Sequence, residues 1–214
     1  LGVIRLILEN KHRMNLMKVF TQNWGISGYE VSENEPLTDL LSFFADRLKV
    51  YLREQGVRHD LISAVFDLGE EDDLVRLLYR VEALGKFLDT DDGANLLTAY
   101  KRAANILRIE EKKDGRIYGH SGGLDNKLLI VKEEFALFEL LMEIRPTVKS
   151  ALDNDDFSLA MSLLASTRQP VDDFFDTVTV NADDPAVREN RLKLLSLIRS
   201  SINQIADFSR IEGG

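Results

Sequence analysis

Apolar residues recur at three- and four-residue steps along most of the chain, and this spacing is typical of helices with one buried face. The spacing predicts helices over residues 37–55, 59–66, 74–88, 94–111, 133–152, 157–167 and 185–211. The best strand signal is the stretch FDTVTVN at residues 175–181, and it is short. We therefore expect an all-α fold, built as a helical bundle.

Residues that cap helices support several of these boundaries. Asp72 or Asp73 can cap the helix at 74–88, and Asp91 or Asp92 can cap the helix that follows. Before the last helix, an aspartate at 184 fits the cap position, and a proline at 185 fits the first helical position, where its missing N–H costs nothing.

The predicted helices fall into two groups. We expect residues 1–68 to form a short helical segment, the tail of a preceding domain, and residues 69–214 to form the main helical domain. Within that domain, glycines and charged residues at 113–127 predict a polar loop. The chain starts without methionine and within an apolar pattern, so we expect it to be a fragment of a longer protein.

Composition narrows the possible functions. Of the 214 residues, 44% are apolar and 29% are charged, which is ordinary for a soluble globular protein. The sequence contains no cysteine, so a disulfide framework, a thiolate zinc site and cysteine catalysis are all excluded. No apolar run approaches the ~18 residues that a membrane span needs, so we expect no membrane partner. The absence of cysteine suits a reducing cytosol, and we expect a cytoplasmic location.

Charge is distributed unevenly along the chain. The net charge of −9 argues against a general nucleic-acid binder, and we expect no DNA partner. Residues 101–116, however, carry six Lys or Arg against three Asp or Glu, and residues 186–199 carry four against one. The cations therefore gather on two of the predicted helices.

Three stretches imitate catalytic or metal-binding motifs. The pair His59-Asp60 resembles part of a metal-dependent phosphohydrolase site, but no second histidine lies at metal-ligand spacing. Residues 89–97 resemble the start of a calcium loop, but the spacing and the bidentate Glu are missing. The glycines of 115–123 are neither preceded by a strand nor followed by GK[ST]. We expect no catalytic residue, no metal site and no cofactor in this chain.

The helix at 94–111 has one apolar face and one cationic face. At about 100° per residue, one face receives Leu96, Tyr100, Ala103, Ala104 and Leu107. Helix surfaces usually mix charges of both signs, whereas the opposite face has no acid at its middle. A solvated face remains one interpretation, and contact with RNA phosphates is the other. The RNA-binding residues predicted on this helix and the last one are Lys101, Arg102, Asn105, Arg108, Lys112 and Arg188.

The last helix places an arginine where an apolar residue is expected. Its apolar stripe comprises Val187, Leu194, Leu195, Ile198, Ile202 and Ile205, and Arg191 lies within it. A buried cation needs a carboxylate, so we expect a structural ion pair between Arg191 and the acids just upstream, Asp173 or Asp176, with Asp172 as a further candidate. Arg188 and Arg199 lie at the edge of the stripe, and we expect them to be freer to meet a ligand.

Three blocks of the sequence resemble a known family. They read FADRLKVYLREQGVRHDLISAV, DGANLLTAYKRAANIL and PVDDFFDTVTVNADDPAVRENRLKLLSLI. They are similar to the C-terminal part of bacterial glycyl-tRNA synthetase β subunits, and the resemblance covers residues 1–214. The last block resembles the helical anticodon-binding domain shared with arginyl-tRNA synthetases, which is named for an Asp-Ala-Leu-Arg motif. Here the motif reads Asp184-Pro185-Ala186-Val187-Arg188, which keeps the acid and the arginine.

The resemblance implies a function that no single motif establishes. The whole enzyme of this family attaches glycine to its tRNA with ATP and magnesium, as a heterotetramer of α and β subunits. The α subunit activates glycine, and the C-terminal domain of the β subunit reads the anticodon. The resemblance therefore implies glycine tRNA and the α subunit as partners, and a fragment that lacks a catalytic centre. The alternative is a helical protein-interaction domain that docks the α subunit without RNA contact, and the overall acidity of the chain favours it.

Overall fold

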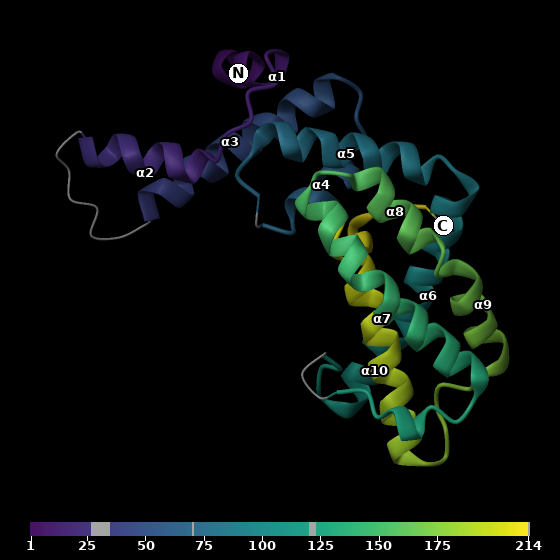
Figure 1. Cartoon of the computed structure of the whole chain (residues 1–214). Coiled ribbons are helices and arrows are strands. Elements are labelled where there is room, and N and C mark those ends of the chain that lie inside the picture. Colours follow the sequence, from purple (N-terminus) through teal and green to yellow (C-terminus); the bar gives the residue numbers. More distant parts are fainter. Residues whose placement is uncertain (27–34, 70, 120–122, 214) are drawn as a thin grey trace. The chain divides into compact units, whose positions relative to one another are not determined.

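The computed structural model describes residues 1–26, 35–69, 71–119 and 123–213, and every regular element in these ranges is helical (Figure 1). The all-α fold predicted from the hydrophobic spacing is therefore confirmed. The stretch with the best strand signal, residues 175–181, forms no strand, because residues up to Thr177 end a helix and the next residues have no regular structure. No helix among the described residues is long and apolar enough to cross a membrane.

The chain forms two compact units, Leu1–Glu82 and Ala83–Gly214. The division falls inside α5 (Leu74–Leu88), a continuous helix. The domain boundary expected after residue 68 stays a prediction.

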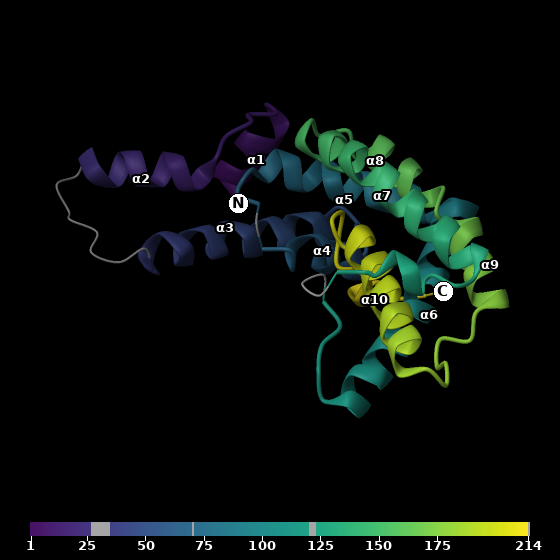
Figure 2. The same ribbon diagram turned by 60° about the horizontal axis from the view of Figure 1, so that its bottom comes forward.

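The first unit contains α1 (Gly2–Glu9), α2 (Leu16–Ile26), α3 (Glu35–Glu54), α4 (His59–Phe66) and the start of α5. Helix α3 packs against α1, α2 and α4, and α2 and α3 lie side by side (Figure 2). The buried apolar side chains of this unit include Leu48, Leu52, Leu61, Ile62, Ala64, Val65, Leu74 and Leu77. Asp73 caps α5, as predicted, by accepting the backbone N–H groups of Val75 and Arg76.

The second unit is a helical bundle. Its elements are α6 (Asp91–Asp114), η2 (Asn126–Leu128), α7 (Lys132–Asp153), α8 (Phe157–Ala165), α9 (Arg168–Thr177), α10 (Pro185–Ile202) and η3 (Phe208–Arg210). Helix α10 packs against both α6 and α7, and α7 also packs against α8 and α9 (Figures 1 and 2). The whole apolar stripe predicted on the last helix, from Val187 to Ile205, is buried. The second unit thus has its core around α10.

The starts of α6 and α10 follow from their capping residues. Thr90, and neither Asp91 nor Asp92, caps α6: its side chain accepts the N–H of Gly93, and the two acids occupy the first turn. They are favourable there because the N-terminus of a helix carries partial positive charge. Asp184 caps α10, as predicted, by accepting the N–H of Ala186 at 2.8 Å.

Helix α9 is a helix of the second unit that the sequence pattern did not predict. Pro170 looked like an interruption, but it is the third residue of α9, where its N–H would have no partner inside the helix. Val171, Phe174 and Phe175 are buried, at helical spacing. The last helix also ends at Ile202 and not near residue 211, because the chain turns there and leads into η3.

Candidate nucleic-acid interface

Helix α6 has the two faces that its sequence predicts. On the face that packs on the bundle, Leu96, Tyr100, Ala103 and Leu107 are all buried. The other face carries, as exposed or half-buried side chains, Lys101, Arg102, Asn105, Arg108 and Lys112. The five residues predicted on this helix therefore lie together on one surface.

Three of these side chains point outward without a partner. Within the described part of the chain, the side chains of Asn105, Arg108 and Lys112 make no hydrogen bond or ion pair, and all three are exposed. Their spacing of three and seven residues places them along about 10 Å of the helix. Ile109, which is 54% exposed, lies at the edge of this set and adds an apolar side chain to the surface. We call Asn105, Arg108, Ile109 and Lys112 the α6 surface.

The other two predicted cations flank this surface and contact the rest of the bundle. The Lys101 ammonium donates a hydrogen bond to the carbonyl of Gly213. The Arg102 guanidinium lies over the Phe175 ring, 4.2 Å from its centroid, and donates to the Phe175 carbonyl at 3.4 Å. Neither side chain pairs with a carboxylate of the described residues, so both still contribute positive charge to this side of α6.

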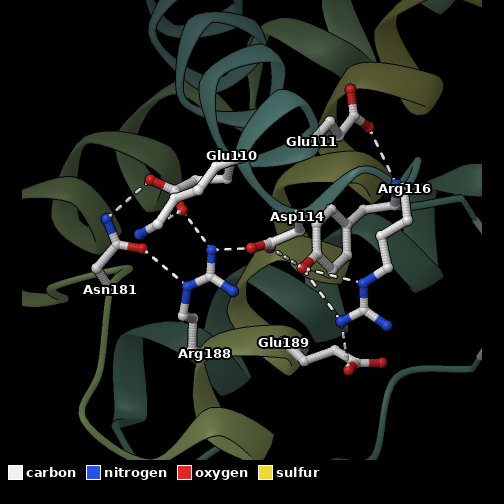
Figure 3. Close-up of polar contacts among 9 residues, drawn as sticks. Glu110, Glu111, Asp114, Arg116, Asn181, Arg188 and Glu189 are labelled. Carbon is white, nitrogen blue, oxygen red and sulfur yellow. Dashed lines mark hydrogen bonds and ion pairs between the residues drawn. The ribbon is translucent and has the colours of Figure 1, made fainter.

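Arg188 is not free, and the expectation that it can readily meet a ligand was wrong. Its guanidinium makes ion pairs with Glu110 and, at 2.8 Å, with Asp114, and its Nε donates to Asn181 (Figure 3). The side chain of Arg188 is only 18% exposed. Arg188 and then Asn181 lower the pKa of Glu110, while a hydrogen bond from Tyr118 and then the pair with Arg188 lower that of Asp114. Arg188 therefore has a structural role in joining α10 to the end of α6.

The same network includes Arg116 (Figure 3), and Arg199 joins it through Glu111. Arg199, also expected to be freer, pairs with Glu111 at 3.0 Å, and the Glu111 carboxylate accepts the backbone N–H of Tyr118 at 3.1 Å. Arg116 pairs with Glu189 at 2.7 Å, which lowers the pKa of the Glu189 carboxyl and raises that of the guanidinium. The network holds the chain that leaves α6 against α10. The sequence feature that could have indicated this network is the group of acids at the end of α6, because they can pair with the arginines of the last helix.

Arg191 is buried and paired, as expected, but its partner is different. The carboxylate that meets it is Glu134 of α7, not Asp173 or Asp176, and Arg191 also donates to the carbonyl of Thr179 at 2.8 Å. The two aspartates lie on exposed positions of α9. The reason for the error is that α9 is a helix: it directs these acids to solvent, whereas α7 packs directly on α10.

The described residues offer little for metal chemistry. No three His, Asp or Glu side chains among them gather where they could hold a metal ion. Asp60, next to His59, pairs with Arg58 at 2.5 Å.

Two family descriptions match separate parts of the chain. The DALR anticodon binding domain matches residues 96–211, which include the whole α6 surface and α7 to α10. The glycyl-tRNA synthetase beta subunit family matches residues 1–67, within the first compact unit.

Curated relatives match along the entire chain. The glycine–tRNA ligase beta subunit of Rhodospirillum centenum is 56% identical over 214 residues. Those of Ruegeria sp. and Cereibacter sphaeroides are 48% identical over 213 and 216 residues. Each match covers 100% of this chain, but the chain spans only about 30% of the length of these relatives.

Proposed function

The chain belongs to the DALR anticodon binding domain family, and on that premise we propose that it is the tRNA-binding module of a glycine–tRNA ligase beta subunit. The observation that carries this proposal is the α6 surface. It combines an outward amide and two outward cations that make no ion pair with a carboxylate in the part of the chain that the structure describes. In a chain with a net charge of −9, such a surface is the part best suited to a polyanion.

Each polar residue of the α6 surface has a role that its chemistry supports. Arg108 and Lys112 contact phosphates, which fixes the position of the RNA but carries no sequence information. Asn105 presents both a donor and an acceptor, so it can read the edge of an unpaired base. Arg102 and Lys101 add positive charge from the flank. We leave Arg188 out of this contact set, because its charge is already paired with Glu110 and Asp114.

The complete enzyme supplies the chemistry. We propose that the ligase attaches glycine to its tRNA in the cytoplasm, with ATP and magnesium, and that the beta subunit works with an alpha subunit in a heterotetramer. The name of the relatives supports the reaction and the second subunit. The described residues do not offer a fitting set of magnesium ligands. We propose that ATP and magnesium bind elsewhere in the enzyme, and that this chain contributes recognition of tRNA.

Binding of glycine tRNA to the purified chain, followed by fluorescence anisotropy, tests the proposal. We expect saturable binding that weakens when the anticodon bases are changed. Arg108→Ala should weaken binding of all these tRNAs alike, by about fivefold to tenfold, because it removes a phosphate contact. Asn105→Ala should instead reduce the difference between the natural and the altered anticodons.

The outcomes separate the proposal from its alternative. Equal affinity for natural and altered anticodons would contradict a role in reading the anticodon. Absence of RNA binding, together with capture of the alpha subunit by the isolated chain, would instead support a protein-docking domain.

A further inference from the structure

A second feature of the bundle lies away from the α6 surface, between α7 and α10. A cavity of about 200 Å³ opens there, and its described lining includes Gly119, Gly123 and Leu124. This is smaller than the roughly 300–1,000 Å³ of pockets for drug-sized ligands, so it suits one small, flat group. None of the residues that line this cavity belongs to the α6 surface.

The walls of the cavity are apolar and its charged groups are cations. Phe138, Met142 and Leu197 supply the apolar lining, and Met142 is 44% exposed. Arg145 and Lys193 are the charged lining residues, and the lining includes no acid. An aromatic ring and a thioether beside cations form a surface on which a flat ring can stack.

The two cations differ in how free they are. The Lys193 ammonium lies 3.0 Å from Glu189 one turn earlier on α10. Arg145 is exposed and makes no ion pair within the residues that the structure describes. It follows Phe138 and Met142 at helical spacing, so its guanidinium shares their face of α7. An unpaired arginine beside an apolar cavity can stack on a ring and also meet a phosphate.

We propose that this cavity receives a single unpaired nucleobase of the bound RNA. Phe138 and Met142 form the stacking surface, and Arg145 meets the base or its adjoining phosphate. This inference rests on the proposed RNA-binding function, and it adds a base-binding site between α7 and α10, away from the α6 surface. The charge of the lining favours RNA over an apolar protein helix, because the exposed Arg145 guanidinium, which makes no ion pair among the described residues, complements a phosphate chain. The base must be unpaired, since a base within a duplex has no free face to insert.

The methyl group of Met142 reports directly on this site. The chain has four methionines, so selective ¹³C labelling of their methyl groups gives a simple NMR spectrum. On titration with a short single-stranded RNA, we expect a saturable upfield shift of the Met142 methyl, caused by the ring current of the stacked base. The Met161 methyl is the internal control, because that side chain is buried in α8 and should not move. The same RNA annealed to its complement should leave Met142 unchanged.

Variants of exposed residues test the site without disturbing the core. Arg145→Ala should weaken binding of the single strand by about fivefold or more. Met142→Glu, which places a carboxylate at the cavity mouth, should weaken it at least as much. Leu159→Glu is the matched control and should leave affinity unchanged, because Leu159 is 43% exposed on α8 and does not line the cavity.

Three results would overturn the base site. RNA binding that leaves the Met142 methyl in place would refute it, while the proposed function would stand. An equal shift with duplex RNA would show that no unpaired base is selected. A shift caused by an apolar helical peptide and not by RNA would identify the cavity as a protein-docking site.

Discussion

Replacement of Arg191 by methionine should destabilise the second unit strongly. The Arg191 side chain is 9% exposed and its partner Glu134 is fully buried. The variant keeps most of the side-chain volume but removes the ion pair with Glu134 and the hydrogen bond to the Thr179 carbonyl. Removal of one partner from a buried ion pair typically costs about 3–5 kcal/mol, because the other charge stays buried without compensation. We expect the free energy of unfolding to fall by an amount in this range.

A double variant that also changes Glu134 tests the same ion pair from its other side. The Glu134 carboxylate also accepts the backbone N–H groups of Ile130 at 2.7 Å and Val131 at 2.9 Å. Glu134→Gln keeps an oxygen for these donors but removes the negative charge. In the double variant with Arg191→Met, the loss should be smaller than the sum of the two single losses by about 1–3 kcal/mol, since neither charge remains alone.

The assay is urea unfolding followed by circular dichroism, with hydrogen exchange of the α7 and α10 amides to locate the effect. Lys149→Met is the matched control, because Lys149 pairs with Asp153 on the exposed side of α7. That variant should cost only about 0.3–0.5 kcal/mol. If Arg191→Met cost no more than this control, or if the two single losses simply added, the ion pair would not stabilise the contact between α7 and α10.

Three further predictions concern stability. The arginines that pair with Glu110 and Glu189 lower the pKa of both carboxyls. The network therefore stabilises the fold fully when the pH is above the unfolded pKa of these groups, near 4.5. This stabilisation is lost as the pH falls through the lower pKa values of the folded state. The urea concentration at the unfolding midpoint should therefore stay constant from neutral pH down to about pH 5 and decrease below pH 4.5. In the Glu110→Gln variant, this decrease below pH 4.5 should be less steep. Gly93→Ala should cost about 1–3 kcal/mol in urea unfolding, because its Cβ would lie 2.0 Å from the Phe87 carbonyl oxygen; an unchanged midpoint would refute this close contact. Asp184→Ala should cost about 1 kcal/mol through loss of the α10 cap, and Asp184→Asn should restore most of it.

The sequence predicted those parts of the fold that depend on local spacing. The buried and exposed faces of α6 and α10 follow from a 3.6-residue period, and each helix carries that information in its own residues. The same local reasoning failed at α9. A proline and a β-branched run at 177–180 suggested an extended connection, but burial of Phe174 and Phe175 favours a helix there.

The ion-pair partners could not be predicted, because packing between distant helices decides them. Arg191 was expected to pair with acids that are close to it in the sequence, but its partner, Glu134, lies 57 positions away. The acids at the end of α6 likewise pair with arginines of α10 that the charge count had treated as free. A count of charges along the chain therefore shows which helices are rich in cations, but it cannot distinguish arginines that form ion pairs from arginines that do not.

The dependence of RNA affinity on salt tests the central claim most directly. Each cation that neutralises a phosphate of a single strand contributes about 0.7 to the slope of log affinity against log salt. For glycine tRNA, the double variant Arg108→Ala/Lys112→Ala should therefore have a slope shallower by about 1.4 than the unchanged chain. The control Lys18→Ala/Lys86→Ala removes the same charge from exposed lysines of α2 and α5, and should keep the slope unchanged. An unchanged slope in the Arg108/Lys112 variant, or an equal change in both double variants, would contradict phosphate contact at the α6 surface.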